Sequence, residues 1–137
     1  MMEQVVSGSQ LLAIVLRHDR GGDPGITFFT PPDFSQQLAY MNHPKGYEIG
    51  GHTHREIERQ IFYTQEVLFV WSGRVRATFY DRDETRVTSR DLNAGDVVML
   101  VSGGHGFEML EDTEMIEVKQ GLYMGDQDKI RYNSGHR

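Results

Sequence analysis

Two histidines separated by one residue, His52 and His54, are the first candidates for chemistry in this sequence. On an extended chain the side chains alternate between two sides, so both imidazoles fall on the same side and can reach one metal ion. The glycine pair before them, Gly50 and Gly51, lets the backbone turn sharply at this point. Taken alone, such a pair is more often an ordinary polar loop than a metal clamp, so the prediction needs further ligands.

Glu66 and His105 are the candidates for those further ligands. Glu66 opens the apolar run VLFVW and shares one side of that strand with Leu68 and Val70. It either points outward at the strand end or faces a pocket with a partner, because burying an unpaired carboxylate is costly. His105 follows the apolar run DVVMLV and has glycines on both sides, a pattern that read alone is more typical of a loop histidine than of a ligand.

The composition limits the chemistry and the partners. The chain has 137 residues, no cysteine and a formal net charge of −6. Without thiolates, a metal must be held by imidazole, carboxylate or water. The acidic balance argues against a nucleic-acid partner. The early apolar run at residues 11–16 is far shorter than the ~20 residues that cross a bilayer, and we recognise no secretory signal, so we expect no membrane partner and a cytoplasmic location.

The elements that must position these residues are short strands. Alternating or apolar runs separated by glycine and proline predict roughly nine strands and no amphipathic helix. The strongest pair, residues 66–71 and 74–80, flanks Ser72-Gly73 and predicts a hairpin with a two-residue turn. Many short strands predict an all-β sandwich, barrel or jelly roll.

The spacing of the candidate residues resembles that of the cupin family over about residues 40–120, most of the chain. The first cupin motif is a glycine, five residues, His-x-His, a gap, a glutamate, six residues and a glycine. Its counterparts in this sequence are Gly46, His52, His54, Glu66 and Gly73.

The second cupin motif is matched in part. Gly95 and His105 stand near the family's spacing, with Val101 where a proline is usual and Met109 where an asparagine is common. Between His54 and the glutamate lie eleven residues instead of the usual three or four. This insertion is predicted to lengthen the hairpin or to form a lip over the mouth of the barrel.

The resemblance implies a fold and a metal site. The fold is all-β, a double-stranded β-helix (jelly-roll) barrel in a single cupin domain of residues 1–137, with the barrel core at about 36–120 and a polar surface tail at 121–137. The metal ligands would be His52, His54, Glu66 and His105. Three neutral nitrogens and one carboxylate suit a divalent transition metal, Mn, Fe, Co, Ni or Zn, acting as a Lewis acid.

The function that follows is an enzyme acting on a small polar or carbohydrate-like molecule, of the isomerase or epimerase type. The tail EVKQGLYMGDQDKIR resembles the ends of small uncharacterised cupins associated with nucleotide-sugar and surface-polysaccharide pathways. Two alternatives stay open: an Fe- or Ni-dependent dioxygenase of an enolic or phenolic substrate, and a non-catalytic module that binds a small ligand. Because single-domain cupins commonly pair through sheet edges, we expect a homodimer, with the N-terminal strand a candidate for exchange.

Three residues near the C-terminus are candidate catalytic groups. Glu117 and Lys119 share one side of a predicted strand and would form an acid/base pair, each shifting the pKa of the other, if that side faces the interior. If it faces out, they belong to a solvated strand edge. Tyr123 either caps the mouth and offers its hydroxyl or packs on the surface. If His105 faces inward, Phe107 and Met109 share its side and form an apolar wall.

Overall fold

The computed structural model describes residues 2–18 and 21–132. Over these residues the chain forms ten strands and one short 3-10 helix, η1, and the architecture is all-β as predicted. The elements are β1 (Met2–Ser7), β2 (Gln10–Leu16), β3 (Gly25–Phe28), β4 (Ala39–Asn42), β5 (Glu66–Ser72), β6 (Arg74–Tyr80), β7 (Arg86–Asn93), β8 (Val97–Leu100), β9 (Gly104–Met109), β10 (Glu114–Lys119) and η1 (Gly125–Asp128).

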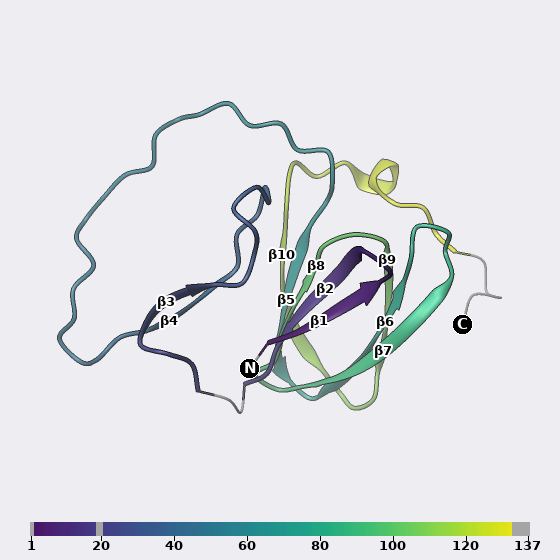
Figure 1. Cartoon of the computed structure of the whole chain (residues 1–137). Coiled ribbons are helices and arrows are strands. Elements are labelled where there is room, and N and C mark those ends of the chain that lie inside the picture. The colour runs from purple at the N-terminus through teal and green to yellow at the C-terminus, as the bar shows by residue number, and fades with distance from the viewer. Residues whose placement is uncertain (1, 19–20, 133–137) are drawn as a thin grey trace.

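The strands form three antiparallel sheets (Figure 1). The largest has the order β1-β2-β8-β5-β10, the second has the order β7-β6-β9, and among the described strands β3 pairs with β4 alone. The two larger sheets stack as a sandwich, and among the described strands they do not close into a barrel. One physical reason is that residues 43–65 contain no strand, so this stretch provides no pairing partner that would join the sheet edges.

Two clusters of apolar side chains hold the sandwich together. The first lies between the two larger sheets and joins Leu68 and Val70 of β5 to Val75 and Phe79 of β6. The second covers the opposite face of the five-stranded sheet, where residues 29–38 pack over it. Leu68 and Val70 of β5 belong to the first cluster and Val67 to the second, so consecutive residues of this strand face opposite sides of the sheet.

The passage from β5 to β6 differs from the predicted hairpin. Both strands lie where the alternation predicted them, but β5 pairs with β8 and β10, whereas β6 pairs with β7 and β9. The Ser72-Gly73 step is therefore a corner between two sheets, and the hairpin prediction is wrong. Gly73 has φ 83°, and a Cβ there would collide with the carbonyl oxygen of Asp112. Local residue types indicate a turn at such a place but not which neighbours the two strands acquire.

The first two strands belong to the packed core. β2 lies between β1 and β8, and Val5 and Leu12 are buried in the cluster between the sheets. The core therefore reaches beyond the range 36–120 that was expected to hold it. The N-terminal strand, expected as a candidate for exchange between subunits, pairs here within its own chain.

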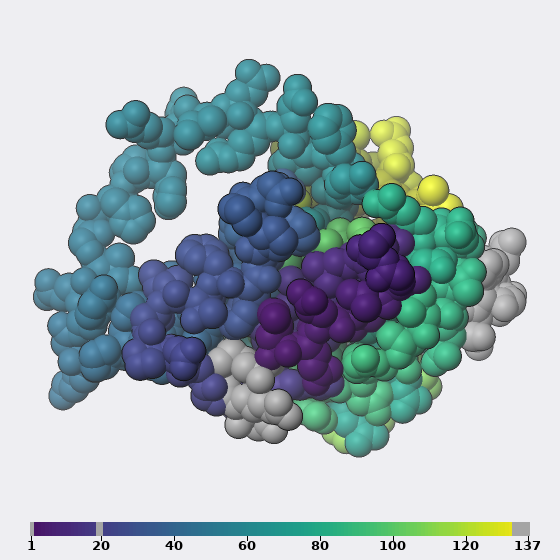
Figure 2. Space-filling view, viewed as in Figure 1, coloured from purple at the N-terminus to yellow at the C-terminus, as the bar shows by residue number. Residues whose placement is uncertain are grey.

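Residues 43–65 form a long segment, most of which stands away from the sheets before its last residues return to β5 (Figures 1 and 2). Every residue from 44 to 64 is exposed, including Ile57, Phe62 and Tyr63. This segment contains the whole of the predicted insertion, residues 55–65. Over residues 2–18 and 21–132, no helix has the length and apolar character needed to cross a membrane.

Candidate functional site

The structure places His52 and His54 in the exposed segment 43–65. Their rings lie side by side, edge to face, with centroids 5.3 Å apart, and Nδ1 of His52 lies 2.9 Å from the carbonyl oxygen of Gly50. The two imidazoles are therefore neighbours, as the spacing predicted. The segment that carries them has no strand partner to fix its position against the sandwich.

Glu66 occupies a different environment at the start of β5. It is only 7% exposed, and the alternation along β5 places it on the side that faces the other sheet, with Leu68 and Val70. Of the two readings that the sequence left open, a solvated strand end or a buried carboxylate with partners, the structure shows the second.

His105 is the partner that reaches Glu66 from the opposite sheet. It lies in β9, opposite Phe79 of β6, and its Nε2 is 3.3 Å from Oε2 of Glu66. The imidazole is about one-third exposed, so one side of it faces the carboxylate and the rest reaches solvent. Phe107 follows on the same side of β9 and packs against the core, whereas Met109 is exposed. The apolar wall predicted from these two residues is thus formed by Phe107.

Lys119 contacts the other oxygen of the same carboxylate. It lies directly opposite Glu66 in the pairing of β10 with β5, and its Nζ is 3.3 Å from Oε1 of Glu66. The same Nζ is 3.1 Å from Oδ2 of Asp128 in η1, whose Oδ1 accepts a hydrogen bond from Thr64 at 2.7 Å. We call Thr64, Glu66, His105, Lys119 and Asp128 the Glu66 cluster.

The charges of the Glu66 cluster follow from these contacts. The hydrogen bond from His105 and the nearby Lys119 ammonium lower the pKa of Glu66, although burial opposes them. The carboxylate of Asp128, and then that of Glu66, raises the pKa of Lys119. The Thr64 hydroxyl and Lys119 lower the pKa of Asp128. At neutral pH the cluster thus holds two carboxylates and one ammonium beside an imidazole.

Of the three predicted catalytic residues, Lys119 belongs to the Glu66 cluster. Glu117 lies two residues before Lys119 on β10, and Tyr123 lies outside the cluster. Met115 packs against the core between the sheets, and Glu117 and Lys119 follow on the same side of β10, so this side faces inward. Glu117 lies opposite Leu68 but is exposed, because β10 is an edge strand. Tyr123 follows β10 and is 92% exposed.

The four predicted metal ligands are placed as two pairs. Their donor types fit a divalent transition metal, but their placement does not form one site. Within the described residues, no group of three or more His, Cys, Asp or Glu side chains lies close enough together to hold an ion. In addition, the Lys119 ammonium already lies beside the Glu66 carboxylate. The metal site therefore stays a prediction, which requires His52 and His54 to move to Glu66 and His105.

Sequence reasoning missed Asp128 and Thr64. Both are polar residues in stretches without a strand pattern, and their contact joins positions 64 residues apart. The only local signal was the acidic DQD run in the tail, which typically marks a solvated surface. Their role becomes visible only through the pairing of β10 with β5, which places Lys119 between them and Glu66.

Comparisons with known proteins add no relative to this description. A scan against protein-family models, a search of curated proteins and a search of solved structures each found no match.

Proposed function

We propose that the protein is an enzyme that moves a proton on a small polar, carbohydrate-like molecule, as an isomerase or epimerase does. The observation that carries the proposal is the meeting of an imidazole and an ammonium on one buried carboxylate, with His105 and Lys119 each 3.3 Å from a Glu66 oxygen. The carboxylate is buried with two specific partners, and the His105 side chain is about one-third exposed, so a substrate can reach the imidazole from solvent.

The roles of the three groups follow from their chemistry. His105 accepts a proton from a carbon next to a substrate carbonyl, because a neutral imidazole has a nitrogen lone pair that can act as a general base. The electron pair of the broken C–H bond moves into a C–C double bond, and the carbonyl oxygen gains negative charge. Glu66 holds the imidazole in orientation and stabilises its protonated form.

Lys119 fits the second half of this reaction. A lysine ammonium has three N–H donors, and two of them are directed to Glu66 and Asp128. The third N–H is suited to the developing oxyanion of the substrate. Delivery of a solvent proton to the opposite face of the same carbon gives epimerisation, with the proton on His105 released to solvent. Return of the proton from His105 to the neighbouring carbon, with proton transfer between the oxygens, gives isomerisation. The raised pKa of Lys119 keeps it a cation, so it serves as a stabiliser rather than as the base.

The experiment uses deuterium. Purified protein is incubated in D₂O with dihydroxyacetone and with D-fructose, and proton NMR follows loss of the C–H signal next to the carbonyl. We expect wild-type protein to exchange that hydrogen in at least one of the two probes and His105→Gln to lose at least 100-fold in rate. Equal exchange by the two proteins would contradict the proposal.

We also propose a jelly-roll arrangement of the cupin type and, as an alternative state of the site, a divalent metal. Support for the fold is the two-sheet sandwich, in which the Gly73 corner carries the chain from one sheet to the other. Support for the metal is the donor chemistry of His52, His54, Glu66 and His105. A bound ion would act as a Lewis acid toward substrate oxygens. An ion held by Glu66 and His105 would occupy the imidazole and displace Lys119, so this metal is an alternative to the proton-transfer roles given above.

A homodimer is also part of the proposal. The outer side of β5 and β10 exposes a patch of apolar side chains, Trp71, Ile116 and Val118. Because β10 is an edge strand, a second copy can cover this patch and the edge together. Light scattering coupled to chromatography should give twice the monomer mass for wild type and the monomer mass for Trp71→Glu. A wild-type protein that is monomeric at all concentrations would contradict this part of the proposal.

A further inference from the structure

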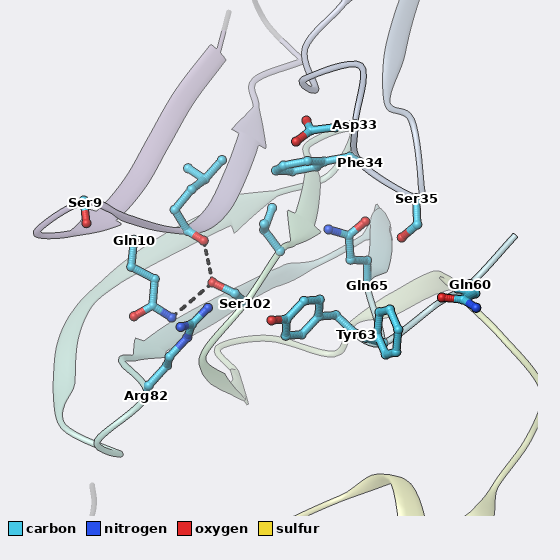
Figure 3. Close-up of a pocket in the computed structure, with 13 residues that line it drawn as sticks. Ser9, Gln10, Asp33, Phe34, Ser35, Gln60, Tyr63, Gln65, Arg82 and Ser102 are labelled. Carbon is cyan, nitrogen blue, oxygen red and sulfur yellow. Dashed lines mark hydrogen bonds between the residues drawn. The ribbon is translucent and has the colours of Figure 1, made fainter.

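A cavity of about 540 Å³ lies at one end of the five-stranded sheet, between the β1–β2 turn, residues 33–35 and residues 60–65 (Figure 3). Its size falls in the range of sites that hold small organic molecules. Figure 3 shows side chains that come from several segments far apart in the sequence and surround one space.

This cavity is separate from the Glu66 cluster. Gln65 lines it, and Glu66 is the next residue along the chain. Consecutive residues of an extended strand point to opposite faces. Glu66 is on the face between the sheets, and Gln65 is on the outer face with Val67, which packs against the second apolar cluster. The cavity thus offers a second place for chemistry, beside the residue that directly precedes β5.

The side-chain amide of Gln65 supports a ligand here. Gln65 is only 6% exposed, and its Oε1 is buried without a hydrogen-bond partner in the part of the chain that the structure describes. An unsatisfied buried carbonyl oxygen costs stability, and native proteins usually pair such groups. Because Oε1 itself has almost no accessible surface, a ligand can donate a hydrogen bond to it, and remove this cost, only after the amide turns toward the cavity.

The other lining groups define the chemistry of that ligand. Phe34 and Tyr63 provide flat apolar faces, and Asp33 and Arg82 provide one acceptor and one donor of opposite charge. Ser102 is held in place because it accepts a hydrogen bond from Gln10 Nε2 at 3.1 Å and donates one to the carbonyl oxygen of Leu11 at 2.6 Å.

These polar groups lie on several sides of the cavity rather than in one plane (Figure 3). Hydroxyl groups around a ring both donate and accept, and such a ring also has apolar C–H faces that pack on aromatic side chains. A phosphate would meet one arginine but also the carboxylate of Asp33, and a planar base presents its donors and acceptors in a single plane. We propose that this cavity binds a neutral, polyhydroxylated molecule of monosaccharide size, with the Gln65 amide turning toward the cavity to accept a hydrogen bond from one hydroxyl.

Titration of the isotope-labelled wild-type protein with four probes tests the proposal. D-Glucose, D-galactose and N-acetyl-D-glucosamine are the saccharide probes, and adenosine is the planar alternative. We expect at least one saccharide to bind saturably, with a dissociation constant on the order of 1 mM. The amide shifts should centre on Phe34, Gln65 and Ser102. Saturable saccharide binding centred elsewhere, tighter binding of adenosine at these residues, or no saccharide binding would overturn the proposal.

A matched pair of variants gives a second readout. Gln36 also has a buried Oε1 without a partner among the described residues, but it lies outside the cavity wall. Gln65→Leu and Gln36→Leu should both raise the Tm of the ligand-free protein, because each removes an unsatisfied oxygen. Only Gln65→Leu should weaken saccharide binding, by at least tenfold. Equal binding by the two variants would overturn the role of Gln65, and the wild-type shift map decides the case if either variant does not fold.

Discussion

Glu66 Oε2 lies 3.3 Å from His105 Nε2, and this contact joins β5 of the five-stranded sheet to β9 of the three-stranded sheet. It brings a carboxylate and an imidazole together across the sandwich, where neither strand pairs with the other. A buried carboxylate with two charged or polar partners has direct consequences for stability and for pH dependence.

Glu66→Gln should lower the free energy of unfolding by about 2 kcal/mol at pH 7, because it leaves Lys119 and His105 without their carboxylate. The pKa of Glu66 is lowered in the folded protein. Its contribution is therefore fully present above the unfolded pKa and is lost as the pH falls through the folded pKa. Urea unfolding at a series of pH values should show stability falling more steeply below pH about 4.5 in wild type than in Glu66→Gln. Parallel pH curves would count against this account.

Asp128→Asn should make the Lys119 amine more reactive. Asp128 is the main cause of the raised pKa of Lys119, so its removal returns that pKa toward the ordinary value and increases the fraction of free amine. Acylation of Lys119 by a limiting reagent, followed by mass spectrometry of the peptides, should be faster in the variant. Asp126→Asn is the matched control, because Asp126 is paired with Arg131 instead. An equal rate in both variants would show that Asp128 does not set the pKa.

The position of a strand such as β6, and the side of it that is buried, can be predicted from the sequence. Val75, Ala77 and Phe79 alternate with polar residues, and β6 has that alternation because one side of it packs against the other sheet. The sequence likewise allows a buried Glu66, because a carboxylate at the start of an apolar run either points to solvent or is buried with partners. The identity of those partners depends on which strands pair, and residue types at the Gly73 corner do not specify this pairing.

The histidine pair shows where such reasoning stops. The period of two places His52 and His54 on one side only where the chain is an extended strand, and their proximity in the structure agrees with this local argument. Meeting Glu66 would also require a partner strand to hold residues 43–65 against the sandwich, and this segment forms no strand. Spacing along the chain contains no information on that long-range contact.

Lys119→Met should strengthen binding of a divalent transition metal. The Lys119 ammonium lies beside Glu66 and competes with any cation for the carboxylate. Its removal should lower the dissociation constant for Ni²⁺ or Zn²⁺ on the order of tenfold. Calorimetric titration of metal-free wild type and Lys119→Met measures this, with Lys45→Met as a control in the exposed segment. Unchanged affinity in Lys119→Met would place any bound metal away from Glu66.

Arg17 pairs with two carboxylates, Asp96 and Glu3. Asp96→Ala should lower the free energy of unfolding more than Glu3→Ala does. Asp96 is buried and accepts hydrogen bonds from Arg17 Nη1 at 3.0 Å and from the backbone N–H groups of His18 and Asn93, each at 2.9 Å. Its loss should cost about 3 kcal/mol, because Arg17 and two backbone donors lose their acceptor.

The partly exposed Glu3, which also pairs with Arg17 at 2.9 Å, is the control for Asp96. Glu3→Ala should cost less than about 1 kcal/mol because solvent screens that pair. Thermal and urea unfolding of both variants provide the comparison. An equal loss of unfolding free energy in the two variants would contradict the claim that the buried carboxylate contributes more than the exposed one.

The most direct test of the proposed chemistry compares Glu66 and His105 with the loop histidines in the deuterium-exchange assay. The account predicts that Glu66→Gln and His105→Gln each lose most of the exchange of the substrate C–H in D₂O. The double variant His52→Ala/His54→Ala should keep a rate within about threefold of wild type, since the proton is moved by groups that meet without residues 43–65. Loss of exchange in the double variant with retention in His105→Gln would contradict the account.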